Sequence, residues 1–106
     1  MSRSEGKKVT QNLTVSTQYI DGLDLTLRSG ISCQLVGPAG GAGTINLEIS
    51  NDGENWFPSG ETAVNITAGK ALFQVTKKYW VARSRFVVTL SAGAGSYSAT
   101  ILSKDI

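Results

Sequence analysis

Hydrophobic and polar residues alternate along most of this chain, which is the period-two pattern of half-buried β-strands. The clearest run is 44–49, where three aliphatic residues are separated by single polar residues. Similar patterns cover 9–15, 19–28, 31–36, 64–66, 72–76, 85–90 and 96–102. No window combines helical spacing with capping residues at its ends, so no long helix is expected. The residues at 85–90 are apolar enough for a central strand.

These runs predict roughly eight or nine strands in one domain, which favours a single all-β antiparallel sandwich. A jelly roll is the preferred topology, and an immunoglobulin-like Greek key is the alternative. The Cys, Trp, Cys pattern of true immunoglobulin domains is absent. Residues 1–8 have no periodicity and are expected to form a polar N-terminal arm, followed by the sandwich domain at 9–106.

The segment 50–56 connects two of the predicted strands and reads Ser-Asn-Asp-Gly-Glu-Asn-Trp. Asn51, Asp52 and Gly53 tolerate positive φ angles, and the polar side chains can cap their own backbone. Trp56 follows with a large ring to pack just beyond the turn. The pattern therefore predicts a structural turn.

Oxygen-bearing side chains are dense enough in this turn to raise the alternative of a calcium loop. Calcium loops normally supply three or more carboxylates at fixed offsets, whereas this segment has two. The self-capping turn is the favoured interpretation. The residues concerned are Asn51, Asp52, Glu54 and Asn55.

The glycine-rich segment 37–43 resembles a phosphate-binding loop in composition only. Such a loop needs a helix behind it, because free amides at the helix N-terminus bind the anion. Here the period-two run 44–49 follows, and the segment contains no lysine. A flexible hairpin loop is predicted instead.

The charge of the chain is nearly balanced, with 10 basic and 8 acidic residues, which argues against a dedicated nucleic-acid binder. Two local basic groups remain, and we interpret them as solvated charges or interface rims. They are Arg3, Lys7 and Lys8 near the N-terminus, and Lys77, Lys78, Arg83 and Arg85 further along.

The chain has no histidine and a single cysteine, Cys33, whose neighbours place it on an apolar strand face. Histidine-based catalytic pairs, zinc sites and internal disulfides are therefore excluded. No carboxylate spacing indicates an acid and base pair. We expect a protein that is not an enzyme, with no cofactor, no metal and no catalytic residue. The N-terminus has no apolar signal region and no run is long enough to span a membrane, so synthesis in the cytoplasm is expected.

Two groups of residues together resemble small bacteriophage virion proteins built as β-sandwiches. The resemblance consists of a strand ending in Ser-Asn-Asp-Gly with Trp soon after, then an Arg-x-Val strand, a Gly-x-Gly hairpin and a last strand ending in Lys. It covers roughly the C-terminal sixty residues. The matching positions are Ser50, Asn51, Asp52, Gly53 and Trp56, followed by Arg85, Val87, Thr89, Gly93, Gly95, Ile101 and Lys104.

The resemblance implies a structural part of a virion, such as a capsid decoration or cement protein, a minor head protein or a fibre or spike module. Its partners would be other virion proteins and further copies of itself, rather than nucleic acid or membrane. Its location would be the virion, after synthesis in the bacterial host. Contacts are expected at residues 1–10 and 103–106. Candidate interface residues are Arg3, Lys7, Lys8, Tyr79, Trp80 and Lys104, while Asn51, Asp52, Gly53, Trp56 and Arg85 are assigned to the turn and core.

A second hypothesis is a carbohydrate-binding sandwich used for host adsorption. Its stacking platforms would be Trp56, Phe57, Tyr79 and Trp80. An accessory protein of a larger complex, unrelated to bacteriophages, is the third possibility.

Overall fold

The computed structural model describes residues 4–25 and 29–104. The described residues form nine strands and no helix, so none of them belongs to a helix that could cross a membrane. The strands are β1 (Ser4–Leu13), β2 (Thr17–Asp21), β3 (Gly30–Val36), β4 (Ala42–Ser50), β5 (Phe57–Pro58), β6 (Val64–Ile66), β7 (Lys70–Gln74), β8 (Arg83–Ala92) and β9 (Gly95–Lys104).

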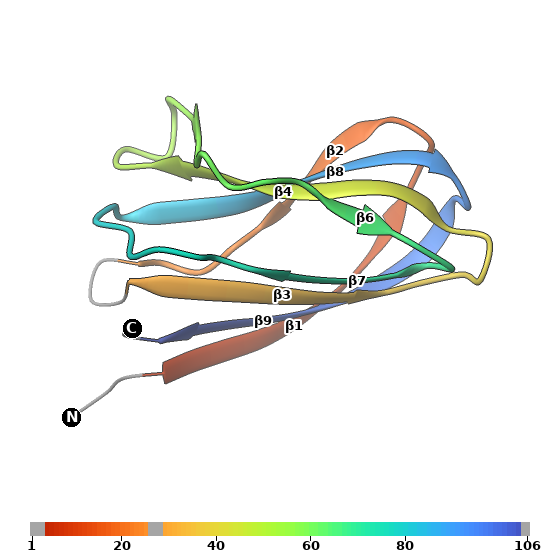
Figure 1. Cartoon of the computed structure of the whole chain (residues 1–106), viewed down its shortest axis with the longest axis horizontal. Coiled ribbons are helices and arrows are strands. Elements are labelled where there is room, and N and C mark those ends of the chain that lie inside the picture. Colours follow the sequence, from red (N-terminus) through yellow and green to blue (C-terminus); the bar gives the residue numbers. More distant parts are fainter. Residues whose placement is uncertain (1–3, 26–28, 105–106) are drawn as a thin grey trace.

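The strands form two sheets that pack face to face (Figure 1). Sheet A has the order β1-β9-β3-β7, and sheet B has the order β2-β8-β4-β5, with β6 also paired to β4. All strand pairs are antiparallel. This arrangement confirms the predicted all-β antiparallel sandwich.

The chain passes from one sheet to the other at nearly every connection, which is the path of a jelly roll. In an immunoglobulin-like sandwich the first two strands are neighbours in one sheet, whereas β1 and β2 lie in opposite sheets here. The preferred jelly-roll topology is therefore the observed one. Figure 1 also shows that the start of β1 and the end of β9 lie at the same end of the sandwich.

The period-two pattern of the sequence matches the two faces of each sheet. On β8, which lies between β2 and β4, Phe86, Val88 and Leu90 are buried while Arg85 and Val87 are only partly covered. The strand predicted as central is central in sheet B. Buried and partly exposed residues alternate along β8 because only its inner face packs against sheet A.

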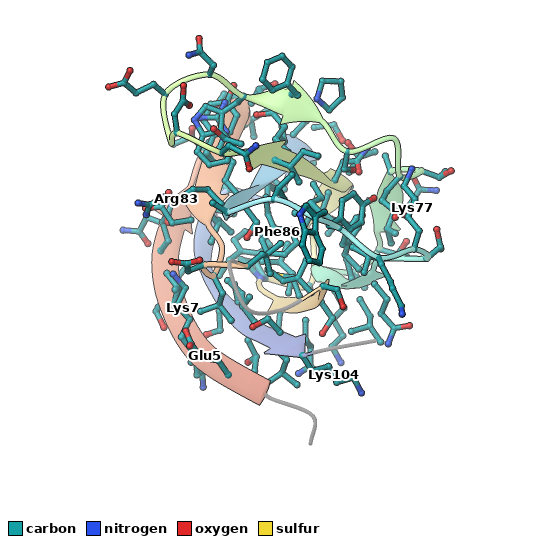
Figure 2. The ribbon with its side chains drawn as sticks, turned by 90° about the vertical axis from the view of Figure 1, so that its left-hand side faces the viewer. Glu5, Lys7, Lys77, Arg83, Phe86 and Lys104 are labelled. Atoms are coloured by element: carbon teal, nitrogen blue, oxygen red, sulfur yellow. The ribbon has the colours of Figure 1, made fainter. Side chains whose placement is uncertain are left out.

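The core lies between the sheets and consists of aliphatic and aromatic side chains from both. Phe73 of β7 and Phe86 of β8 meet across the interface in an edge-to-face contact, with ring centroids 5.8 Å apart. Figure 2 shows Phe86 inside the sandwich. The buried hydrophobic residues are Leu13, Ile20, Leu23, Leu25, Ile31, Cys33, Leu35, Ile45, Leu47, Ile66, Phe73, Tyr79, Phe86, Val88, Leu90, Tyr97, Ala99 and Ile101.

Two predicted boundaries need correction. Residues 4–8 are not an arm, because they form the first half of β1 and pair with the end of β9, from Ser4 opposite Lys104 onward. The polar sequence of β1 hid this pairing, since an edge strand buries little side-chain surface and is held by backbone hydrogen bonds. The strand predicted at 19–28 begins earlier and ends at Asp21, and its residues 26–28 lie outside the described part.

Glycines bring two loops together at the end of the sandwich opposite the start of β1 and the end of β9. The amide of Gly69 donates to the carbonyl of Gly41 at 2.9 Å, and the amide of Gly37 donates to the carbonyl of Gly69 at 2.8 Å. Gly69 has a φ of 76°, and a β-carbon there would lie 2.0 Å from the carbonyl oxygen of Pro38. The segment predicted as a flexible hairpin loop is therefore hydrogen-bonded and closely packed against its neighbours.

We expect Gly69→Ala to lower the free energy of unfolding by about 2–3 kcal/mol. Alanine is strained in the left-handed backbone conformation of this residue, and its β-carbon would clash with the carbonyl oxygen of Pro38. Urea denaturation measures the change. Gly40→Ala is the matched control, since a β-carbon at Gly40 meets nothing within 4 Å. Equal effects of the two substitutions would contradict the close packing described for Gly69.

Candidate functional site

The outer face of sheet B carries a cluster of aromatic and charged side chains around Arg85. The Cζ atom of Arg85 lies 3.8 Å from the ring centroid of Tyr19 and 4.4 Å from that of Trp56. Its Nε donates to Oε1 of Glu48 at 2.7 Å, and its Nη2 lies 2.7 Å from the same oxygen. We call these four residues the Arg85 cluster.

Strand register explains why these residues meet. Arg85 of β8 lies directly opposite Glu48 of β4 and Asp21 of β2, and Tyr19 is two residues away from Asp21 on the same face. Trp56 arrives from the turn that follows β4. The cluster thus joins three strands that are far apart in the sequence.

The Arg85 cluster has the composition of a protein contact surface. Tyr, Trp and Arg are the residue types that contribute most to binding energy at interfaces. Two aromatic contacts and the ion pair with Glu48 hold the guanidinium in place, so binding would cost little additional ordering. Tyr19 remains 45% exposed.

The structure places Trp56 and Arg85 differently from the turn-and-core assignment. Both are partly exposed on the outer face of sheet B, and neither belongs to the core between the sheets. The sequence pattern alone does not mark Tyr19 as a member of a functional site. Its alternation with the buried Ile20 does, however, indicate that Tyr19 points to the outer face of the sheet.

The turn that follows β4 is closed by its own side chains. Oδ1 of Asp52 accepts hydrogen bonds from the amides of Glu54 and Asn55, both at 2.8 Å, and from the hydroxyl of Ser50 at 3.0 Å. Oδ2 accepts from Nδ2 of Asn55 at 2.8 Å. Gly53 has a φ of 76°, as a tight turn requires.

These hydrogen bonds stabilise the ionised form of the Asp52 carboxylate. Bonds from the backbone and side chain of Asn55, then from Glu54 and Ser50, lower the pKa of Asp52 well below its usual range. Both carboxylate oxygens already accept hydrogen bonds. Among the described residues, no group of three or more potential ligands is placed to hold a metal ion.

A second exposed feature is the loop at 75–82, which we call the Trp80 loop. It is anchored by Tyr79, whose buried hydroxyl donates to the carbonyl of Ser59 at 3.2 Å and to Oε2 of Glu61. Burial, followed by the hydrogen bond to Glu61, raises the pKa of Tyr79. Desolvation acts to raise the pKa of Glu61, but hydrogen bonds from Tyr79 and Thr76 outweigh it and lower that pKa.

Backbone hydrogen bonds hold both sides of the Trp80 loop. The amide of Tyr79 donates to the carbonyl of Ser29 at 2.9 Å, and the carbonyl of Ala82 accepts from the amide of Leu25 at 2.8 Å. The amide of Ala82 also donates to Oδ1 of Asn51 at 3.0 Å, which ties the loop to the turn after β4.

Trp80 lies in the middle of this anchored loop and is 97% exposed. Tyr79 and Trp80, the two neighbouring aromatics predicted as interface residues, therefore differ in exposure. Tyr79 is buried and supports the loop, whereas Trp80 is fully available to a partner. Val81, the residue after Trp80, borders an open hollow of about 380 Å³, which is lined by Ile49, Ser50, Asn51, Asp52, Asn55, Phe57 and Val81.

The remaining candidate interface residues that the structure describes lie at the same end of the molecule or along β1. Figure 2, which looks at this end, shows Lys7, Lys77, Arg83 and Lys104 around its rim. Lys8 is exposed on β1 next to Lys7. Arg3 lies outside the described residues. The start of β1 and the end of β9 are paired, so the segments expected at interfaces adjoin one another.

No protein-family model matches this sequence, and no curated protein matches it significantly. The fold is similar to that of a chain in the solved structure of Bacillus endospore appendages, described as a novel family of disulfide-linked pili. The TM-score is 0.53 at 14% sequence identity, and the match covers 99% of this chain and 89% of that chain. This similarity shows a shared small antiparallel sandwich fold. None of the comparisons links the chain to bacteriophage proteins.

Cys33 is the one cysteine of the sequence and lies in the core of sheet A with 0% exposure. Burial raises the pKa of its thiol to about 12. A thiol in this environment is neither ionised nor accessible at neutral pH. Subunits of this chain therefore cannot be linked through Cys33 while the sandwich is folded.

We expect Cys33 to react with a thiol reagent such as Ellman's reagent only after denaturation. The measurement is the absorbance change at pH 8 in buffer and in concentrated guanidinium chloride. Complete reaction in buffer within the time that an unfolded sample needs would contradict the buried position.

Asp52 should contribute a pH-dependent part of the stability. Because its folded pKa is lowered, its contribution is present above the unfolded pKa of about 3.9 and is lost as the pH falls through the folded pKa. We expect Asp52→Asn to be less stable than the wild type at pH 7, with the difference shrinking below about pH 4. Urea denaturation as a function of pH measures this. Glu54→Gln, on the same turn, is the control and should show a smaller difference at pH 7.

Proposed function

We propose that this chain is a non-enzymatic structural protein that acts through contacts between subunits, and that the assembly is a bacteriophage virion. Within a virion, its role would be that of a capsid decoration or cement protein, or of a minor head or fibre protein. The protein would be made in the bacterial cytoplasm and end in the particle. The sequence resemblance supports the choice of assembly.

The observation that carries the structural role is the Arg85 cluster on the outer face of sheet B. Tyr19, Glu48 and Arg85 lie on strands of sheet B, and Trp56 joins them from the turn after β4, so that cation–π contacts and an ion pair hold residues of interface type in place. An arrangement of this kind suits a surface that docks in one orientation. The similarity in fold to a pilus protein supports a role in assembly, since the same sandwich serves there in a polymer.

Assembly of this chain would not use a disulfide through Cys33. The endospore appendages with the similar fold are described as disulfide-linked, whereas Cys33 is buried in the core here. Subunit contacts would therefore depend on packing and hydrogen bonding at the surface.

The proposal predicts that the protein is a component of purified virions. Mass spectrometry of particles from the source should find it in a ratio to the major capsid protein that fits a symmetric position, and immunogold microscopy should place it on the head or fibre. Presence in the lysate together with absence from purified particles would rule the virion role out.

A binding assay tests the outer face of sheet B directly. Particles that lack the protein are incubated with recombinant variants and sedimented. We expect Tyr19→Ala to weaken binding at least about 10-fold, as hot-spot truncations do. Leu102→Ala, which removes a similarly exposed side chain from the outer face of sheet A, should bind like the wild type. If the wild type, Tyr19→Ala and Leu102→Ala bound equally well, the Arg85 cluster would not be the docking surface.

A carbohydrate-binding module is the second candidate, and the exposed ring of Trp80 favours it. The aromatic set expected for stacking is reduced by the structure, because Tyr79 is buried and Trp56 contacts Arg85. Trp80 and Phe57 remain. Reproducible binding on a glycan array that is lost in Trp80→Ala would favour this function over the structural one.

A further inference from the structure

The end of the sandwich that bears Trp80 combines a protruding ring with a hollow beside it. Trp80 is presented by an anchored loop, so its exposure is a fixed feature of the fold. Burying the apolar surface of an exposed indole ring is favourable, and the exposed ring of Phe57 adds to the apolar surface at this end of the sandwich. The ring therefore indicates a contact that the isolated chain does not make.

The hollow has the size and chemistry to accept such a ring. Its volume is about 380 Å³, which leaves room for an indole. Ile49, Phe57 and Val81 provide the apolar surface, and Phe57 is 60% exposed. Asn51 and Asn55 lie on the polar rim, where the indole N–H could find an acceptor.

The turn that borders the hollow carries two carboxylates and has Arg83 against it, while the loop that bears the ring carries two lysines. Lys77 and Lys78 precede Trp80 on its loop and are exposed, whereas Asp52 and Glu54 lie on the turn that borders the hollow. The loops at the opposite end of the sandwich, at 13–16, 36–43, 67–69 and 91–95, contain no charged residue. Charged side chains therefore lie at the end of the sandwich that bears the ring and the hollow.

We propose that the occupant of the hollow is Trp80 of a second copy of this chain. Ring and hollow lie at the same end of the molecule and share the Trp80 loop, through Val81. A two-fold axis between two copies lets each ring enter the other hollow, which is the self-complementary contact of a symmetric pair. The same operation brings Lys78 of one copy near Glu54 of the other. This inference rests on the proposed role in subunit contacts and names one of them.

Sedimentation across a concentration series tests the contact with purified full-length protein. The wild type should associate to a pair, and Trp80→Ala should raise the dissociation constant at least about 30-fold, as the loss of a central hot spot does. Leu72→Ala is the matched control, since it removes an exposed side chain from the outer face of β7. It should leave the dissociation constant unchanged.

Charge exchange gives an independent test of the geometry. Lys78→Glu and Glu54→Lys should each weaken self-association, because each places like charges opposite one another in the pair. An equimolar mixture of the two variants should restore association, since both contacts between unlike copies become attractive. Neither substitution touches the core, so both variants should unfold at nearly the wild-type urea concentration.

The outcomes separate this inference from the proposed function. A wild type that stays monomeric, or a pair that Trp80→Ala leaves intact, overturns the ring-in-hollow contact, while detection of the protein in purified virions would still support the structural role. Dissociation by Leu72→Ala instead would place the interface on sheet A. Loss of glycan binding in Trp80→Ala without any self-association would assign the ring to a carbohydrate and overturn the contact between copies.

Discussion

The rest of the structure depends on the burial of one face of each sheet against the other. Phe73 and Phe86 contact each other across the two sheets, and buried hydrophobic residues from both sheets surround them. Burial of this surface provides the main favourable free energy of folding. Because burial of the inner faces provides this free energy, the residues of the outer faces, edges and end loops can vary without loss of the fold.

Those free surfaces distinguish this chain from others with the same fold. The outer face of sheet B positions Arg85 between strands that bring Tyr19 and Glu48 to it, and the anchored loop holds Trp80 in solvent. The pilus protein with a similar fold shares 14% of its residues with this chain, so its contacts cannot be transferred. A common sandwich supports many assemblies, and the particular one depends on the side chains outside the core.

Much of the fold could be predicted because alternation reports directly on the inner face. The runs at 44–49 and 85–90 became parts of β4 and β8, adjacent strands of sheet B. The site was harder to predict. Tyr79 and Trp80 are neighbours with similar chemistry, yet one is buried and the other exposed. The difference arises from Ser59 and Glu61, distant residues that accept hydrogen bonds from Tyr79.

The sequence by itself determined the sandwich class and the residues of its inner faces, since the period of two is a local property of the strand. It also determined the exclusion of histidine chemistry, which needs no structure. Only the tertiary structure decided that residues 4–8 belong to β1, that Arg85 meets Tyr19, Glu48 and Trp56, and that Trp80 is exposed while Val81 borders a hollow. These features depend on strand register and on loops meeting across the fold, and neither is encoded within a short window of sequence.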